Sequence, residues 1–138
     1  MNGGVLGIDP GVAKVGFALV DDAGRAIVAG IEPVEGLTRR IAALVAAHPI
    51  RALAVGRGTR SAAVGRALEE FGLPIHFVDE YETSRRAREL YFAENPPRGW
   101  RRLVPVGLLL PPRPIDDYAA VLIARRYLAR EQSEPSPN

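Results

Sequence analysis

Short apolar runs separated by turn residues open the sequence and predict three β-strands. The runs cover residues 5–9, 15–20 and 25–32. The first run ends in Asp-Pro-Gly, and Asp21 to Gly24 lies between the second and third runs as a hairpin turn. Because strands joined by such short turns pair side by side, the pattern predicts a three-stranded antiparallel meander.

From residue 37 onwards, helical and strand-like patterns alternate. Apolar residues at helical spacing predict helices over 37–47, 62–71, 83–95 and 115–130, and short apolar runs predict strands over 51–55 and 75–78. This order predicts an α/β fold with a mixed five-stranded sheet, made of the meander plus two parallel strands, with helices on its faces. The first, fourth and fifth strands are expected to be parallel and central.

Two segments fall outside this pattern. Residues 96–114 form a loop rich in Pro, Gly and Arg, and loops of that length inside a compact domain are usually functional or disordered. Residues 132–138 are polar and are expected to form a disordered tail. With 138 residues and no internal repeat, the chain is expected to form a single domain over residues 1–131.

Composition narrows the class of protein. Apolar residues make up 47% and charged residues 25% of the chain, which is typical of a globular protein. No apolar run approaches the roughly 18 residues of a membrane span, and no secretory signal is visible, so we expect a soluble cytoplasmic protein without membrane contact. The absence of cysteine excludes disulfides, thiolate zinc sites and thiol catalysis.

Charge is nearly balanced overall but unevenly distributed. The formal net charge is +2, and Lys14 is the only lysine among the 18 basic residues. Between Arg85 and Arg113 the sequence has seven arginines and two acids. Since arginine suits bidentate phosphate contacts, this segment predicts binding to a phosphate backbone. The alternative is that the first three of these arginines form the solvated face of a helix.

Acidic residues stand at three places where a strand ends or a helix begins. Asp9 ends the first strand, Asp79 and Glu80 follow the fifth, and Asp116 and Asp117 open the last helix. Because ligands of such sheets bind beyond the carboxyl ends of the parallel strands, we expect these carboxylates to converge there. A divalent cation relieves their mutual repulsion, and oxygen ligands without His or Cys suit Mg²⁺ or Mn²⁺. Two such ions about 4 Å apart can support phosphodiester hydrolysis.

Each acidic site also has a simpler interpretation. Asp9 belongs to a common turn sequence, and acids at the start of a helix favour the helix dipole whether or not they bind a metal. His48 and His76 lie at a helix end and inside a strand, where we interpret them as structural. The three acidic sites together favour a metal site over three separate turns and caps.

Three motifs in chain order resemble one group of nucleases. Gly7-Ile8-Asp9-Pro10-Gly11, followed by Gly16-Phe17-Ala18, resembles the first strand and hairpin of RNase H-fold nucleases. The likeness is greatest to the RuvC Holliday junction resolvase group and the related YqgF (RuvX) family. Val78-Asp79-Glu80 with Thr83-Ser84 resembles the Asp-Glu and Ser/Thr pairs of the YqgF family, and residues 115–123 resemble its last helix. The resemblance spans Val5 to about Leu128 and implies an RNase H-like fold.

The resemblance also implies a metal-dependent nuclease. By position, Asp9, Glu80 and Asp116 would be catalytic and would hold Mg²⁺ or Mn²⁺, expected as two ions. Asp117 stays a candidate fourth ligand, since adjacent helix positions point about 100° apart and both acids cannot aim equally well at one site. The implied substrate is structured nucleic acid, either branched DNA, as for the resolvases, or precursor small-subunit ribosomal RNA, as for the YqgF family.

The sequence departs from the family pattern in three places. Tyr81 stands where the YqgF family usually has Arg. After the fourth strand this chain has Val55 to Ser61, whereas the family has a longer Gly-Leu-Pro loop. Residues 95–114 match no standard family feature. The candidate nucleic-acid contacts are Lys14, Arg57, Arg60, Arg98, Trp100, Arg101 and Arg102. Trp100 either stacks on an unpaired base or anchors the loop to the domain, and Lys14 is either a phosphate contact or a solvated hairpin residue.

Two other functions fit parts of this pattern. Actin-like kinases and chaperone ATPases also open with Gly-x-Asp-x-Gly, but their fold needs two such halves and a much longer chain. A non-catalytic nucleic-acid-binding module could keep the fold without the reaction, although acids at all three sites argue against it. A resolvase needs a symmetric dimer for two matched cuts, and the apolar residues 104–110 either supply a homodimer interface or belong to the core.

Overall fold

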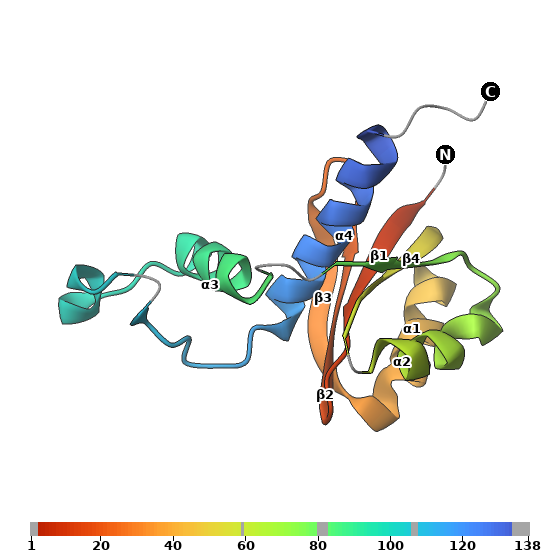
Figure 1. The fold of residues 1–138 in the computed structure, drawn as a ribbon, viewed down its shortest axis with the longest axis horizontal. Helices are drawn as coiled ribbons and strands as arrows, with labels where there is room; N and C mark the ends of the chain where they lie inside the picture. Colours follow the sequence, from red (N-terminus) through yellow and green to blue (C-terminus); the bar gives the residue numbers. More distant parts are fainter. Residues whose placement is uncertain (1–2, 59, 80–82, 106–107, 134–138) are drawn as a thin grey trace.

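The structure, a computed structural model, describes residues 3–58, 60–79, 83–105 and 108–133. They form a mixed sheet in the order β3-β2-β1-β4-β5 (Figure 1). The strands are β1 (Gly4–Asp9), β2 (Lys14–Val20), β3 (Ala26–Pro33), β4 (Ile50–Gly56) and β5 (Ile75–Val78). β2 pairs antiparallel with both β1 and β3, whereas β4 pairs parallel with β1 and β5. The predicted meander with two added parallel strands is confirmed.

Helices cover both faces of this sheet. α4 (Asp116–Ser133) crosses one face, and α1 (Leu37–Ala47) and α2 (Ser61–Leu68) cover the other (Figure 1). Successive strand residues alternate between two hydrophobic cores, so that Val5 packs toward α4 whereas Leu6 packs toward α1 and α2. Both faces of the central strands are therefore buried, which explains why they read as continuous short apolar runs in the sequence.

α4 approaches the sheet closely because the strands present small residues beneath it. A Cβ on Gly7 of β1 would lie 2.9 Å from the Cβ of Ala124, and it would collide with the carbonyl oxygen of Ala120. Both alanines are fully buried. Only glycine fits at position 7, since any side chain there would push the helix off the sheet.

The fifth strand and the second helix differ in detail from the prediction. β5 lies at an edge of the sheet rather than in its centre. α2 ends at Leu68 and continues as a 3-10 turn, Glu69–Phe71, instead of running to residue 71 as an α-helix. The turn ends at Gly72, whose φ of 68° is left-handed, as the predicted glycine helix end requires.

The last helix is longer than predicted because its final turn is tied to β4. Arg51 donates hydrogen bonds to both carboxylate oxygens of Glu131, at 2.7 and 2.8 Å. α4 continues to Ser133, so the first two residues of the tail expected over 132–138 are helical. Residues 134–138 lie outside the described residues. Neither α4 nor any other helix in the described part of the chain is long and apolar enough to cross a membrane.

The segment between β5 and α4 projects from the domain as an arm, defined here as residues 83–105 and 108–115. α3 (Thr83–Glu94) forms the part of the arm that packs against α4. A 3-10 helix, η3 (Gly99–Leu103), lies at the outer end (Figure 1). The loop expected over 96–114 therefore contains a short helix and extends away from the sheet.

Candidate functional site

Asp9 and Asp116 come together across Gly16. Asp9 is the last residue of β1 and pairs with Gly16 of β2. A Cβ on Gly16 would collide with the backbone carbonyl of Asp116 and would lie 2.8 Å from the Cβ of Asp116. The first turn of α4 therefore rests directly on the strand pair that ends at Asp9. The structure brings these two predicted acids to one edge of the sheet.

Strand alternation fixes the side of the sheet on which Asp9 projects. Val5 and Gly7 of β1 face α4, and the same alternation continues to Asp9. The Asp9 side chain consequently lies on the side of the sheet that carries Asp116. Asp9 is partly buried there.

The surroundings of Asp116 disfavour a lone negative charge. Burial raises the pKa of the Asp116 carboxyl, and the neighbouring charge of Asp117 raises that pKa further, whereas the Lys14 ammonium lowers it. A partly buried carboxylate beside other acids is the kind of group that a cation stabilises. The oxygen donors of Asp9 and Asp116 suit Mg²⁺ or Mn²⁺.

Asp117 faces different surroundings from Asp116. Arg113 donates hydrogen bonds to both carboxylate oxygens of Asp117, each at 3.2 Å. Asp117 also lines a hollow of about 400 Å³ together with Glu94 and Arg25, and neither Asp9 nor Asp116 lines this hollow. Since adjacent helix positions point about 100° apart, one acid faces the sheet edge and the other faces the arm.

The predicted Asp79-Glu80 pair is described only in part. The Asp79 side chain is 83% exposed, and its carboxylate lies 3.9 Å from Nε of Arg57. Glu80, the expected third ligand, lies outside the described residues, so its role stays a prediction. Over the ranges that the structure describes, no three His, Asp or Glu side chains form a group able to hold a metal ion.

Three predicted phosphate contacts lie around the same edge. Arg57 follows β4, and its backbone N–H donates to the carbonyl oxygen of Val78, the last residue of β5, at 2.8 Å. Arg60 precedes α2 and, with Gly11 from the loop after Asp9, lines a hollow of about 110 Å³. Lys14 begins β2 and is exposed. All three cations can reach phosphates that approach the edge from solvent.

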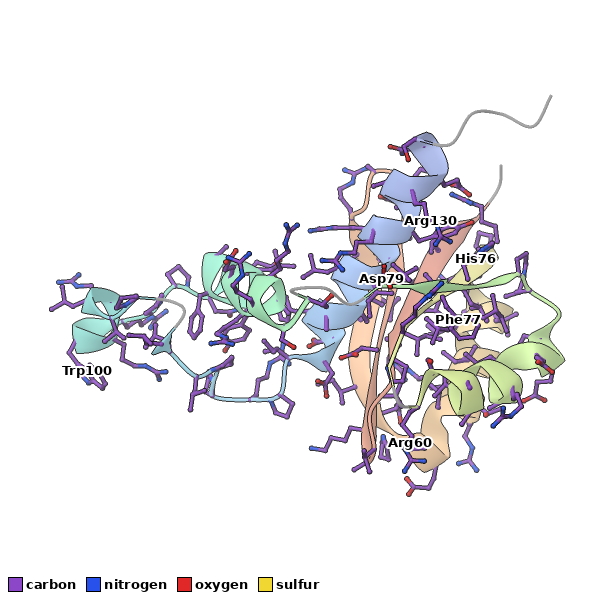
Figure 2. The ribbon with its side chains drawn as sticks, viewed as in Figure 1. Arg60, His76, Phe77, Asp79, Trp100 and Arg130 are labelled. Carbon is purple, nitrogen blue, oxygen red and sulfur yellow. The ribbon has the colours of Figure 1, made fainter. Side chains whose placement is uncertain are left out.

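The other predicted contacts are on the arm rather than beside the acids. These residues, at or next to η3, are Arg98, Trp100, Arg101 and Arg102. Figure 2 shows Trp100 at the outer end of the arm. Because the Trp100 side chain is 73% exposed, its interpretation as an anchor that holds the loop to the domain is wrong.

Two arginines of α4 that are not among the predicted contacts cover the edge of β5. Arg126 donates from Nη1 to the carbonyl of Asp79 at 2.6 Å. Arg130, which is labelled with Phe77 in Figure 2, donates from Nη1 to the carbonyl of Phe77 at 3.4 Å. These bonds occupy carbonyl groups that an edge strand otherwise exposes. The i, i+4 spacing of the two arginines is a sequence signal for a shared helix face, but it does not identify β5 as their neighbour.

His76, interpreted as structural from the sequence, packs within the fold. Its ring lies 4.7 Å from the ring of Tyr127 in α4, and the Tyr127 hydroxyl donates to Glu131 at 3.1 Å. His48 forms the C-cap of α1, where its backbone N–H donates to the carbonyl of Leu44. The contacts of both histidines are those of structural residues.

Comparison with known proteins identifies the fold. No family model matches the sequence, and no curated protein matches it. The structure is similar to T. thermophilus RuvC in complex with a Holliday junction substrate, with a TM-score of 0.61 and 21% identity over 94% of this chain and 96% of that chain. A second Thermus thermophilus RuvC structure matches with a TM-score of 0.52 and 21% identity over 98% of this chain and 99% of that chain. The chain has an RNase H-like fold, as the sequence resemblance implies.

Proposed function

We propose that this protein is a divalent-metal-dependent nuclease that hydrolyses phosphodiester bonds in structured nucleic acid. The observation that carries the proposal is the approach of Asp116, at the start of α4, to the end of β1 where Asp9 lies, with Gly16 between them. Two carboxylates from separate segments at the carboxyl edge of parallel strands need a countercharge. The RNase H-like fold shared with RuvC supports this assignment.

The donor set fits a hard divalent cation. Asp9 and Asp116 would hold Mg²⁺ or Mn²⁺ through carboxylate oxygens, with Glu80 as the predicted third ligand. Asp117 is paired with Arg113 and would support the metal site without binding the metal directly. When bound, the metal supplies activation of a water molecule and stabilisation of the leaving oxygen.

The cationic side chains at the edge would bind the substrate backbone. Lys14, Arg57 and Arg60 surround the end of β1 and are exposed, so phosphates can reach them. Arg57 is 3.9 Å from Asp79, but a phosphate can displace this contact because both side chains are largely in solvent. Holding phosphates on both sides of the reacting bond would orient that bond toward the acids.

Two substrates are supported by different observations. The matching RuvC structure contains a Holliday junction substrate, which favours branched DNA. The Asp79-Glu80 and Thr83-Ser84 pairs resemble the YqgF family and favour precursor ribosomal RNA. The fold similarity covers most of the chain, so branched DNA is the first substrate to test. On a four-way junction, two matched cuts would require a symmetric dimer.

A non-catalytic nucleic-acid-binding module is the alternative. The observation that favours it is the set of exposed arginines at the sheet edge and on the arm, among them Arg57, Arg60 and Arg102. Such a module would use its arginines to bind nucleic acid without turnover. Metal-dependent cleavage distinguishes the two functions.

The test is a cleavage assay with Mg²⁺ or Mn²⁺ on a four-way DNA junction, duplex DNA, single-stranded DNA and RNA, and a structured ribosomal RNA precursor. Asp9→Asn should abolish cleavage and retain or tighten binding, because it removes negative charge from the edge. Asp22→Asn is the matched control, since this acid is 69% exposed in the hairpin turn after β2.

The outcomes separate the proposals. Paired symmetric nicks in the junction would identify a resolvase, whereas a preference for RNA would identify an RNA-processing nuclease. Binding without cleavage of any substrate would favour the non-catalytic module. Wild-type turnover by Asp9→Asn would show that the acids at this edge are not the reaction site.

A further inference from the structure

The outer end of the arm exposes a group of large apolar side chains, which we call the tip. Its members are Trp100, Leu103, Leu108 and Leu110, which are 73%, 82%, 75% and 77% exposed. Leu109 is buried in the arm, so the described residues of the apolar stretch 104–110 are divided between a small core and solvent. Clustered exposed apolar residues mark an interaction surface.

The tip lies in a segment whose only formal charges are positive. Between Asn95 and Ile115 the sequence contains four arginines and no Asp or Glu. Arg98 and Arg102 are exposed, whereas Arg101 is partly buried and donates to the carbonyl of Leu110 at 2.9 Å. An apolar surface edged by guanidinium groups fits a partner that combines flat apolar groups with negative charge.

A hollow in the arm is lined by aromatic, proline and arginine side chains. It has a volume of about 260 Å³ and is lined mainly by Tyr91, Phe92, Pro97, Arg98, Arg101 and Pro112. Tyr91 and Phe92 are themselves held edge to face, with ring centroids 5.1 Å apart. Both rings are only 7% exposed and form the wall of the hollow, so Trp100 is the exposed ring in the described part of the arm on which an unpaired base can stack.

The base of the arm is fixed to the helix that carries Asp116. The Arg113 guanidinium pairs with Asp117 and lies over the rings of Tyr91 and Tyr118, at 5.6 and 5.5 Å from their centroids. The Tyr118 hydroxyl donates to Glu94 of α3 at 2.9 Å. Both segments of the arm, residues 83–105 and 108–115, are thereby joined to the first turn of α4. The tip therefore projects from the turn that carries Asp116 to the acidic edge, by which we mean the sheet edge where Asp9 and Asp116 lie.

We propose that the tip is a second nucleic-acid-binding site, which stacks Trp100 on unpaired bases and places the neighbouring backbone at the acidic edge. The role in placing the substrate rests on the proposed nuclease function, whereas stacking by Trp100 is testable without it. A second copy of the chain would bring the arginines of two tips together. A lipid surface would not use the ring-lined hollow. Unpaired bases satisfy the apolar, cationic and ring-lined features at once.

The chain offers a direct probe of this proposal, because Trp100 is its only tryptophan. Asp9→Asn protein without metal is titrated with labelled oligonucleotides: a single strand, a blunt duplex and a duplex with a single-stranded flap. Label anisotropy reports binding anywhere on the protein, and tryptophan emission reports contact at the tip. Single strand and flap should quench Trp100 emission, and blunt duplex should bind with little quenching.

Substitution of Trp100 supplies the second measurement. Trp100→Ala should weaken single-strand binding by roughly 5- to 150-fold, which is the loss of one stacked base. Trp100→Phe should recover most of that affinity, since it keeps an aromatic face. Ile27→Ala, at a 52% exposed apolar residue of the edge strand β3, is the matched control and should leave binding unchanged. Circular dichroism checks that each variant is folded.

Three results would overturn the proposal. Trp100 emission could stay unchanged while anisotropy shows saturation with single strand. Emission could instead shift to the blue only with phosphatidylglycerol vesicles, which would indicate a lipid surface. It could also shift with protein concentration as sedimentation detects a dimer, which would indicate a second copy. Cleavage without quenching of Trp100 emission would contradict only the proposal that the tip binds unpaired bases. Quenching without cleavage of any substrate would contradict only the proposed nuclease function.

Discussion

Asp116 opens α4 directly over Gly16, the residue that pairs with Asp9 across β1 and β2. Because Gly16 has no side chain, the helix begins in contact with the strand backbone. Two acids that are far apart in the sequence thus reach one edge of the sheet. The position of Asp116 depends on this contact, which makes Gly16 a steric determinant of the site although it carries no functional group.

Gly16→Ala should destabilise the protein and displace the first turn of α4. The added methyl would overlap the Asp116 carbonyl, which is backbone and cannot rotate away. Overpacking of this kind costs about 1–3 kcal/mol of unfolding free energy, and metal-dependent cleavage should fall in parallel. Urea unfolding and the cleavage assay measure the two effects. Gly36→Ala is the control, because the methyl there meets only the flexible end of Glu32, and equal losses in both variants would contradict the steric argument.

Asp116→Asn and Asp117→Asn should have unequal effects on cleavage. Asp116 lies over the strand pair that ends at Asp9, so its loss should reduce the rate by more than the roughly 10- to 100-fold typical of an outer-sphere partner. Asp117 pairs with Arg113, so its loss should fall within that range or below it. Single-turnover rates on one substrate compare the two variants. A larger loss for Asp117→Asn would assign the ligand role to Asp117.

Arg60→Ala should lower nucleic-acid affinity and reduce its dependence on salt. Each lost phosphate contact reduces the slope of log K against log salt by about one. Arg60 immediately precedes α2 and lines a hollow with Gly11 beside the end of β1. Arg66 is exposed in the last turn of α2. Binding titrations at several salt concentrations compare Arg60→Ala with Arg66→Ala. Equal slopes for the two variants would remove Arg60 from the binding surface.

Glu131→Gln should lower the free energy of unfolding at neutral pH. It should also make that free energy fall less as the pH is lowered. Hydrogen bonds from Arg51 hold the pKa of the Glu131 carboxyl below its ordinary value of 4.5. The native state therefore binds this proton less readily than the unfolded chain, and the stability gain is present above about pH 4.5 and lost as pH falls through the native pKa. The hydrogen bonds to Arg51 are worth about 1.5–3 kcal/mol together.

Urea unfolding between about pH 3 and pH 7 tests this prediction. The wild-type protein should lose more stability on acidification than Glu131→Gln does. Glu70→Gln, at an exposed acid of the 3-10 turn after α2, is the control and should follow the wild-type curve. Parallel curves for wild type and Glu131→Gln would show that the Arg51 contact does not stabilise the native state.

Arg113→Lys should loosen the arm without changing net charge. Lysine cannot make the paired hydrogen bonds to Asp117 or lie flat over the rings of Tyr91 and Tyr118. Limited trypsin digestion should then cut faster at the arginines of η3, while thermal unfolding of the sheet changes little. Arg39→Lys, at an exposed position of α1, is the control. Unchanged cleavage rates in the arm would show that Arg113 does not hold it.

Much of the fold could be predicted from the sequence because its signals are local. The hairpin turn at residues 21–24 and the alternation of helices and strands were sufficient to predict the meander and the parallel strands. The left-handed Gly72 marks a helix end in the sequence as it does in the structure. The edge position of β5 could not be predicted, because strand order depends on contacts between distant segments.

The candidate site was predictable in part for the same reason. The position of Asp9 at a strand end is local, and the helical angle between Asp116 and Asp117 follows from helix geometry. Which of the two acids faces the sheet depends on how α4 lies on Gly16, and that contact is tertiary. Glu80 lies outside the described residues and stays a prediction.

By itself, the sequence determined the order and type of the elements and the places where acids end strands and begin a helix. Tertiary structure decided that Asp116 rather than Asp117 shares an edge with Asp9, and that Trp100 projects on an arm instead of anchoring a loop. The physical reason is the range of the interactions. Turns, helical spacing and strand alternation act over a few residues, whereas the contact of α4 with Gly16 joins segments that only the packed sheet brings together.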